Sequence, residues 1–244
     1  MNLTTPLATP PSYPPLFNSE TSAPEPVARE KRGIADTTRR WPDGELTVAL
    51  DLADRKSTAL VLDAITEWAH HIPGLRLQIV SGKKGDIRIS DSAERQGNWS
   101  SVGTAAKKVP LHVPTLHVDR NEDSKEFRQT VLHEFGHALG LTHEHQHPEN
   151  DINWKKGFIY KGYEGPGVDR GVIYNNFFAL PTGSQLLVKN YDPKSVMHYM
   201  IDPDLTKDAR GVPENYTLSK GDKEIIRTLY TPGRFQGTEP TPAQ

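Results

Sequence analysis

The sequence predicts a domain of the α+β class, in which a mixed sheet is backed by helices. Three observations lead to this prediction. Apolar and polar residues alternate in segments 45–50, 75–80 and 86–90, as they do in half-buried strands. Segment 57–72 lies between the first two of these strands and carries apolar residues close to helical spacing, namely Leu60, Ile65, Trp68 and Ala69. A strand, a helix and two further strands in this order favour a sheet with a helix on one face.

The remaining segments complete this layout in chain order. Residues 96–104 contain Gly, Ser and Thr and predict a loop, whereas residues 115–119 predict a short further strand. Beyond residue 140 the chain is irregular, with many aromatic residues and glycines, until a last helix near residues 219–230. We find no internal repeat.

The best-defined helix is expected between residues 123 and 139. Asp123 and Glu126 stand at the spacing of a capping box, with Ser124 as a competing cap. Gly140 is expected to end the helix, because glycine adopts the positive φ that many helix ends require. The apolar residues predicted to form its buried stripe are Phe127, Val131, Leu132, Phe135, Ala138 and Leu139.

Composition divides the chain into three parts. Residues 1–40 hold seven of the 20 prolines, together with many Ser and Thr residues. Such a segment buries too little apolar surface to offset its ordering entropy, so we expect it to be disordered. Its basic pairs, Lys31-Arg32 and Arg39-Arg40, leave open a linker, a pro-segment removed by proteolysis or an export segment. Residues 41–231 form the predicted folded domain, and residues 232–244 a flexible tail.

Composition also excludes several functions. The absence of cysteine from all 244 residues excludes a disulfide scaffold, a thiolate zinc finger and a cysteine nucleophile. The 29 basic and 31 acidic residues nearly balance, so charge gives no reason to expect nucleic acid or an anionic membrane as a partner. No apolar run approaches the ~18 residues of a membrane span. The first ten residues lack the features of a classical signal peptide, which leaves the cytoplasm, or export by a leaderless or effector-type route.

The candidate chemistry is concentrated in the predicted helix, which contains HEFGH at 133–137. Residues four apart share one helix face, so His133 and His137 can bind the same ion. Glu134 points to the flank of that ion, where it can accept a proton from a water that the metal activates. The glycine that ends the helix turns the chain, and His143 can then approach the ion. Three imidazoles with one open position indicate one catalytic zinc ion.

Two alternatives to this ligand set remain open at this point. His145 and His147 bring the number of histidines to five within fifteen residues, and His143 and His147 are themselves four apart. A ligand set built from them would leave the helical pair and the glycine turn unexplained. The other alternative is a helix with two solvated or core-paired histidines, followed by hydrogen-bonded or exposed ones.

A second segment fits the first. The sequence YDPKSVMHY occupies residues 191–199, about fifty residues further along the chain. Met197 can form a soft hydrophobic floor under the metal ligands. Tyr199 can present its hydroxyl to the metal or to a tetrahedral oxyanion. Alone, this segment would indicate no more than a core methionine and a core tyrosine.

Together these motifs resemble those of the metzincin metallopeptidases and, within that clan, those of the astacin family. The extended motif at 133–143 has the metzincin form, and Glu144 is similar to the residue that follows the third histidine in astacins. Residues 195–199 resemble the astacin Met-turn, and Trp41-Pro42 resembles the pair near the start of mature astacin domains. The resemblance covers about 41–231. Short, cysteine-free microbial relatives are a better fit than the disulfide-bonded animal members.

The resemblance implies a two-lobed zinc endopeptidase. Its upper lobe would hold a mixed sheet with two helices above a cleft, and its lower lobe would be irregular with a C-terminal helix. By the same resemblance, Glu134 would be the general base and Tyr199 would stabilise the oxyanion. The zinc ion would be bound by His133, His137 and His143.

The resemblance also implies how partners bind. A protein or peptide substrate would lie extended along an edge strand, expected at residues 115–119. We expect a monomer with neither a nucleic-acid partner nor a membrane span. Glu144 would meet a buried mature N-terminus. The aspartate that keeps astacin precursors latent has no clear counterpart, and Asp36 is its one candidate.

Two functions are compatible with this pattern. The first is hydrolysis of peptide bonds by a zinc-activated water, with Glu134 as the base. The second is a zinc-stabilised binding module that has lost catalysis. The presence of Glu134 favours the first function, because a binding module needs no base.

Overall fold

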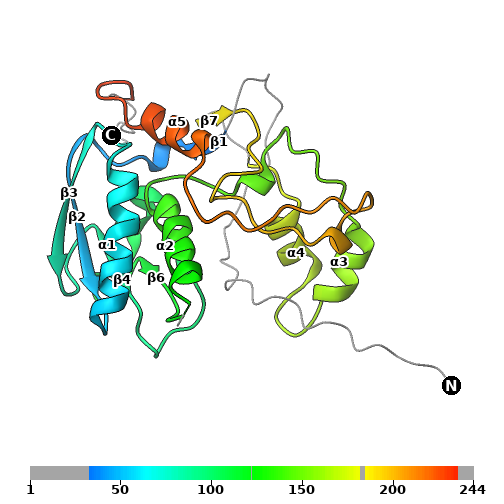
Figure 1. Cartoon of the computed structure of the whole chain (residues 1–244), viewed down its shortest axis with the longest axis horizontal. Helices are drawn as coiled ribbons and strands as arrows, with labels where there is room; N and C mark the ends of the chain where they lie inside the picture. Colours follow the sequence, from blue (N-terminus) through cyan, green and yellow to red (C-terminus); the bar gives the residue numbers. More distant parts are fainter. Residues whose placement is uncertain (1–32, 122, 182–184, 236–244) are drawn as a thin grey trace, which may run out of the picture.

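Five strands form a mixed sheet on the left side of Figure 1. This computed structural model describes residues 33–121, 123–181 and 185–235. The first four strands of the sheet are parallel, and the last is antiparallel to its neighbour. Their spatial order is β3 (Leu75–Ser81), β2 (Gly44–Asp51), β4 (Ile87–Ser90), β6 (Leu116–His117) and β5 (Trp99–Ser100). The predicted α+β class is confirmed.

The edge of this sheet differs from the prediction. The strand expected at 115–119 is β6, which lies between β4 and β5 rather than at the edge. The edge strand next to β6 is β5, inside a segment that the sequence predicts as a loop; β3 forms the opposite edge. Two residues are too few to show an alternating pattern, so the local sequence carries no strand signal there. Trp99 of β5 stacks on the buried ring of His117 in β6, with ring centroids 5.7 Å apart.

Two helices, α1 (Arg55–Ala69) and α2 (Ser124–Ala138), lie side by side on one face of the sheet (Figure 1). Trp68 joins them, because its indole N–H donates a hydrogen bond to the carbonyl of Leu132 over 3.0 Å. The buried stripe predicted for α2 is confirmed, whereas Ala69, expected on the buried face of α1, is exposed. The side chains that the two helices bury in this first core include Val61, Ala64, Ile65, Trp68, Phe127, Val131, Leu132 and Phe135.

The two ends of α2 fix the helix that carries the histidine motif. At its start, the Asp123 carboxylate accepts hydrogen bonds from the backbone N–H groups of Lys125 and Glu126. Glu126 does not complete the predicted capping box; its carboxylate accepts a hydrogen bond from the side-chain amide of Asn121 at 3.0 Å. At the other end, Gly140 has a φ of +100°, as expected of the residue that stops the helix. The chain therefore turns directly after the motif.

A second, two-stranded sheet pairs segments that are far apart in the sequence. Strand β1 (Gly33–Asp36) is antiparallel to β7 (Leu186–Lys189), and both lie beside α5 (Lys220–Leu229) at the top of Figure 1. Residues 33–40 therefore contain β1 and a 3-10 turn (Thr37–Arg39), which corrects the domain boundary predicted at residue 41. Composition could not reveal that residues 33–36 form a strand, because the partner of β1 lies far along the chain. Residues 1–32 of the predicted N-terminal segment lie outside the described residues.

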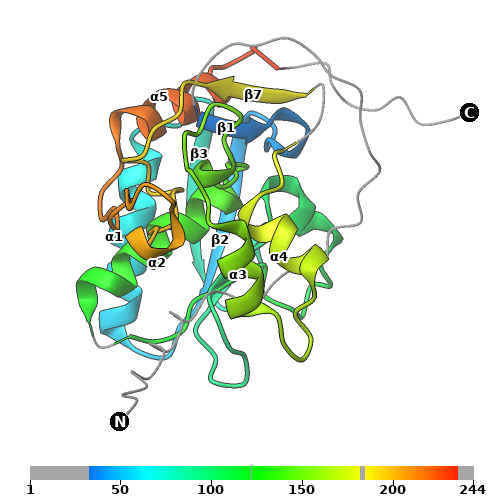
Figure 2. The same ribbon diagram turned by 90° about the vertical axis from the view of Figure 1, so that its right-hand side faces the viewer.

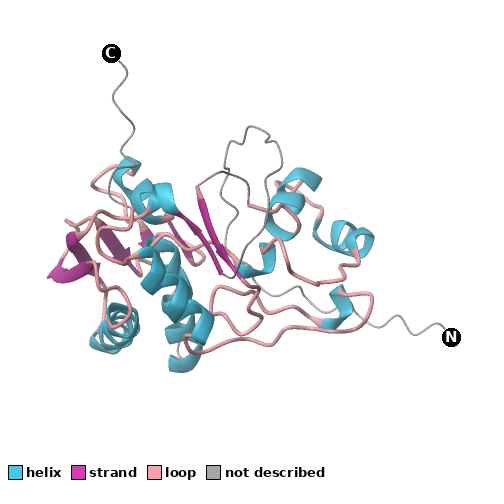
Figure 3. Cartoon of the chain, turned by 90° about the horizontal axis from the view of Figure 1, so that it is seen from above, coloured by secondary structure: helices cyan, strands magenta, loops and turns pink. Residues whose placement is uncertain are grey.

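The right side of Figure 1 is a smaller unit with a core of its own. It contains α3 (Lys156–Tyr163) and α4 (Arg170–Phe177), in a stretch that the sequence predicts as irregular. Each helix has only eight residues, too few for a clear apolar period. Figure 3 shows from above that this unit lies apart from the five-stranded sheet. Its buried side chains are Trp154, Ile159, Ile173, Phe178, Ile201 and Leu205. Further 3-10 helices span Gly103–Lys108, Glu144–Gln146 and Pro203–Leu205.

The second sequence motif, at residues 191–199, contributes side chains to both cores. Val196 and Met197 belong to the first core, whereas Tyr199 packs against the second. The last predicted helix is α5, and its apolar side chains join the first core. Phe235, in the tail predicted to be flexible, also packs against that core, and residues 236–244 lie outside the description. Within the described part of the chain, no helix combines the length and the apolar character needed to cross a membrane.

Candidate metal centre

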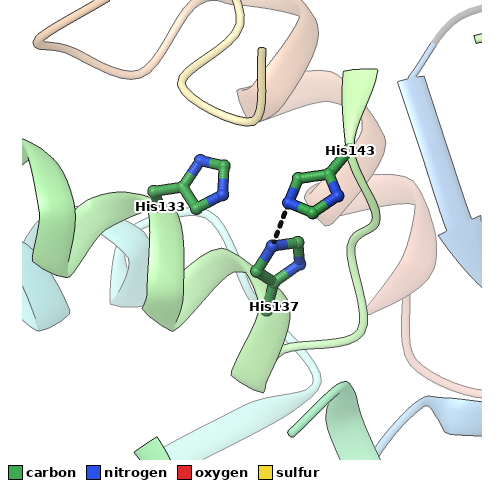
Figure 4. A group of neighbouring side chains, drawn as sticks. All are labelled: His133, His137 and His143. Atoms are coloured by element: carbon green, nitrogen blue, oxygen red, sulfur yellow. Dashed lines mark hydrogen bonds between the residues drawn. The ribbon is translucent and has the colours of Figure 1, made fainter. Parts of the chain in front are cut away.

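Three histidines converge at the end of α2 (Figure 4). His133 and His137 lie one helical turn apart, and their rings meet edge to face with centroids 4.7 Å apart. His143 follows the turn at Gly140, and one nitrogen of each ring lies within 4.8 Å of those of the other two. The Nε2 atoms of His137 and His143 are 3.0 Å apart. Two nitrogen ligands of a tetrahedral zinc ion are about 3.3 Å apart, so this spacing suits one ion.

Backbone carbonyls orient the two helical histidines. The Nδ1–H group of His133 donates to the carbonyl of Val196 at 2.7 Å, and that of His137 donates to the carbonyl of Leu141 at 2.8 Å. Because a carbonyl only accepts, each Nδ1 carries the proton and each Nε2 keeps its lone pair. The Nε2 atom of His133 is buried and has no hydrogen-bond partner among the described residues. A buried lone pair of this kind fits a metal ligand whose other nitrogen is held by an outer partner.

Burial keeps the three imidazoles neutral. Desolvation lowers the pKa of His133 to about 4 and the pKa of His137 to about 3. It also lowers the pKa of His143 well below its usual range, and the neighbouring His137 adds to this effect. Neutral imidazole is the form that binds zinc. The donor set, its protonation and its spacing therefore fit a zinc ion with three nitrogen ligands.

Glu134 lies beside this cluster without belonging to it. It follows His133 on α2 and is only 4% exposed. Desolvation raises the pKa of its carboxyl group to about 8. The group of possible ligand atoms consists of the three histidines and does not include this carboxyl. Its position therefore suits a proton acceptor next to the metal rather than a ligand.

The second motif packs under the histidine cluster. The carbonyl of Val196 holds His133, and the carbonyl of Met197 accepts a hydrogen bond from the backbone N–H of Glu144 at 2.9 Å. A Cβ atom at Gly136 would overlap the sulfur of Met197. Only glycine at this position lets α2 approach Met197 as closely as it does. The sequence alone does not reveal this requirement, because a glycine inside a helix does not by itself identify its contact.

Asp222 fixes this motif from α5. Its carboxylate accepts hydrogen bonds from the Ser195 hydroxyl at 2.5 Å and from the Val196 N–H at 3.0 Å. The same carboxylate accepts a hydrogen bond from the N–H of Ser219, which caps α5 in a complete capping box. Helix α5 thus holds the segment whose carbonyl orients His133. The spacing of Ser219 and Asp222 indicates a helix cap, but not this second set of partners.

Tyr199 lies among the histidine rings. Its ring centroid is 4.3 Å from that of His143 and 5.6 Å from that of His133. His145 stacks on Tyr199 with centroids 4.6 Å apart and an angle of 20° between the ring planes. His145 is buried, and its Nε2–H donates to the carbonyl of Asn176 at 2.8 Å. The structure thus brings Tyr199 and the three histidines together and adds His145, which the sequence placed only past the third histidine.

The alternative ligand set is not supported by this geometry. Both ring nitrogens of His147 are engaged: Nε2 donates to the carbonyl of Lys189, and Nδ1 accepts a hydrogen bond from the N–H of Glu149 at 2.9 Å. His145 uses Nε2 for a backbone carbonyl, and its Nδ1 is buried without a hydrogen-bond partner among the described residues but is not one of the converging nitrogens. Neither ring belongs to the group of possible metal ligands in the described residues.

Two acidic residues that the family resemblance singled out have other partners. Asp36 caps the first 3-10 turn, where its carboxylate accepts a hydrogen bond from the N–H of Thr38 at 2.9 Å, and it is not part of the ligand group. Glu144 is buried and accepts a hydrogen bond from the N–H of Asp192 at 2.7 Å. Burial raises the pKa of the Glu144 carboxyl to about 9. The expected contact of Glu144 with a mature N-terminus stays a prediction.

Comparisons with known proteins agree with this geometry. The model of the peptidase family Astacin matches residues 33–204. The solved structure of myroilysin is similar, with a TM-score of 0.73 and 33% identity, over 81% of this chain and 98% of that one. The astacin-like metalloendopeptidase of Mus musculus is 28% identical over 179 residues, which are 69% of this chain and 35% of that protein. Meprin A subunit beta of Mus musculus is 30% identical over 181 residues, 70% of this chain and 22% of that protein. The chain thus spans about a third or less of the length of these two relatives.

Proposed function

Since the chain belongs to the astacin family of peptidases, we propose that it is a zinc-dependent endopeptidase that hydrolyses peptide bonds of protein substrates. The observation that carries this proposal is the convergence of His133, His137 and His143 beside the buried carboxyl of Glu134; all three imidazoles are neutral, and those of His133 and His137 are buried. These three residues would hold one zinc ion. When bound, zinc supplies the Lewis acidity that activates water and polarises the scissile carbonyl.

Glu134 is the proposed general base. Its carboxylate takes a proton from the attacking water while a C–O bond forms at the scissile carbonyl. The same carboxyl then gives this proton to the leaving amine as the C–N bond breaks. Its place on α2, directly after His133, keeps the base and the metal ligands on one rigid element.

The substrate chain is proposed to lie along β5. This strand forms one of the two edges of the five-stranded sheet, and it packs beside α2. An extended peptide can add to such an edge through backbone hydrogen bonds. Trp99–Ser100 thereby takes the place of the edge strand expected at 115–119. A monomer suffices for this arrangement, because every proposed site residue comes from one chain.

Tyr199 is proposed to donate its hydroxyl hydrogen to the oxyanion of the tetrahedral intermediate. Tyr199→Phe is therefore expected to lower kcat by about 10²–10³-fold, the typical loss for one oxyanion donor, with little change in KM. Bound zinc, measured by atomic absorption, should stay at the wild-type level. The matched control is Tyr174→Phe, on the exposed face of α4. An unchanged kcat in Tyr199→Phe would exclude the oxyanion role.

Mass spectrometry of casein fragments tests the proposed function directly. The zinc-loaded full chain is expected to release internal peptides, whose new ends lie inside the casein sequence. Removal of single terminal residues would contradict an endopeptidase, and the absence of any cleavage by zinc-loaded protein would contradict a peptidase.

A further inference from the structure

A pocket of about 780 Å³ opens in the smaller part of the fold. It lies against α3 and α4, which stand side by side in Figure 2. Its volume is in the range of about 300–1,000 Å³ that binding sites occupy. We call it the lysine pocket, and the residues of its wall that matter here are Trp154, Lys156, Phe158, Phe178, Leu180 and Lys207.

The wall of the lysine pocket combines rigid aromatic rings with exposed apolar side chains. Trp154 and Phe178 pack edge to face, with ring centroids 5.8 Å apart. Phe158 is 53% exposed and Leu180 is 48% exposed, although both are large apolar residues. Exposed apolar groups gathered at one concave site are typical of a surface that receives a partner. The wall therefore suits a large apolar or aromatic side chain.

The lysine side chains that line the pocket give it a positive charge. Lys155, Lys156 and Lys207 line it, and none of the described residues of its wall is Asp or Glu. The Lys156 ammonium lies 4.8 Å from the ring centroid of Phe178, directly over the aromatic wall. Lys155 donates a hydrogen bond to the backbone carbonyl of Asp204 at 3.1 Å. The carbonyl is neutral, so this contact does not neutralise the charge of Lys155. Such a site attracts carboxylates and repels basic segments.

The ring of His145 lies between the lysine pocket and the candidate metal centre. His145 lines the pocket, and it stacks on Tyr199 with ring centroids 4.6 Å apart. Tyr199 in turn lies 4.3 Å from the ring of His143. An extended chain advances by about 3.3 Å per residue, so a substrate held at the metal centre reaches the pocket within a few residues.

We propose that the lysine pocket docks a segment of the protein substrate in which a large apolar or aromatic side chain is flanked by carboxylates. This proposal rests on the proposed peptidase function, because the docked chain is the chain that is cut. The apolar side chain packs between the aromatic wall and Phe158, and the carboxylates pair with Lys156 and Lys207. The pocket thereby favours acidic segments close to the cleavage site.

The test reverses the charge of the lysine pocket in the full, zinc-loaded chain. The variant Lys156→Glu/Lys207→Glu is compared with Lys84→Glu/Lys161→Glu, which changes the net charge equally. Lys84 and Lys161 are exposed and lie outside the pocket. The substrates are fluorogenic peptides that share one cleavage site. They carry Glu-Phe-Glu or Lys-Phe-Lys a few residues away, on either side of that site.

The wild-type chain is expected to show a KM about tenfold lower for the acidic peptide, with a similar kcat, as two exposed ion pairs can provide. The pocket variant should lose or invert this preference, and the control variant should keep it. Salt should weaken the preference, because exposed charges are screened. A preference that survives in the pocket variant, or that the control variant also loses, overturns the proposal.

Peptide binding separates this proposal from the peptidase function. Fluorescence anisotropy on the Glu134→Gln chain measures binding of the same peptides whether or not any of them is cut. Tighter binding of the acidic peptide that depends on Lys156 and Lys207, and that Phe158→Ala weakens several-fold, supports the docking site even if hydrolysis fails. Equal binding of both peptides rejects it. Dimerisation that the pocket variant abolishes would assign the pocket to a second copy of the chain and overturn the proposal.

Discussion

Replacing Glu134 by glutamine is expected to lower casein hydrolysis by about 10²–10⁴-fold, the usual contribution of a general base, while one zinc ion stays bound. Glutamine keeps the size of the side chain and its place on α2, but it cannot take the proton of the attacking water. Zinc should remain because Glu134 is not among the proposed ligands, which are His133, His137 and His143. Activity and bound zinc are measured on the same sample.

The outcome for Glu134→Gln also separates the two functions that the sequence left open. Glu94→Gln is the control, since Glu94 is exposed and lies in a loop far along the chain from the motif. Full activity of Glu134→Gln would contradict the proposed base. If the wild-type chain bound zinc without cutting casein, the binding module would be the better account, and the variant would behave like the wild type.

The second large effect is expected from His137→Ala, which should remove both zinc and activity. Loss of an outer hydrogen-bond partner of a metal ligand typically weakens metal binding about 10–100-fold, so loss of a ligand itself should exceed this range. The effect should be measured as zinc affinity by competition with a coloured chelator. Circular dichroism is recorded in parallel, because His137 is buried and its truncation leaves a cavity.

Two further histidine variants make this result specific. His112→Ala removes an exposed imidazole away from the cluster and should change nothing. His147→Ala removes a ring whose two nitrogens already have backbone partners, and it should keep zinc near the wild-type affinity. A His137→Ala chain with full zinc content, or a His147→Ala chain without zinc, would contradict the ligand set proposed here.

The helix that carries the histidine motif could be predicted because its signals are local. Its cap at Asp123, its apolar stripe and its stop at Gly140 all lie within one short segment. The convergence of the three histidines follows from the helical period and from that stop, and the ligand spacing agrees with it. The tyrosine at 199 could be linked to this site only through the resemblance to a family.

Features that depend on distant residues could not be predicted in this way. Strand β1 is fixed by β7, which lies some 150 residues further along the chain, so composition alone placed it in a disordered segment. Asp222 looks like an ordinary helix cap, and only the fold shows that it holds Ser195 and Val196. Strand β5 is too short to show a period. The lysine pocket gathers residues from three separate segments, and its shape exists only in the folded chain.

A zinc titration of the metal-free chain tests whether this protein is a zinc-dependent peptidase. The metal is removed with a chelator, zinc is returned in steps, and bound zinc and casein hydrolysis are measured at each step. If the three histidines hold one catalytic zinc ion, both quantities should rise together and reach a plateau at one zinc ion per chain. Full hydrolysis by the metal-free chain would contradict this expectation, as would a chain that binds one zinc ion and still cuts no casein.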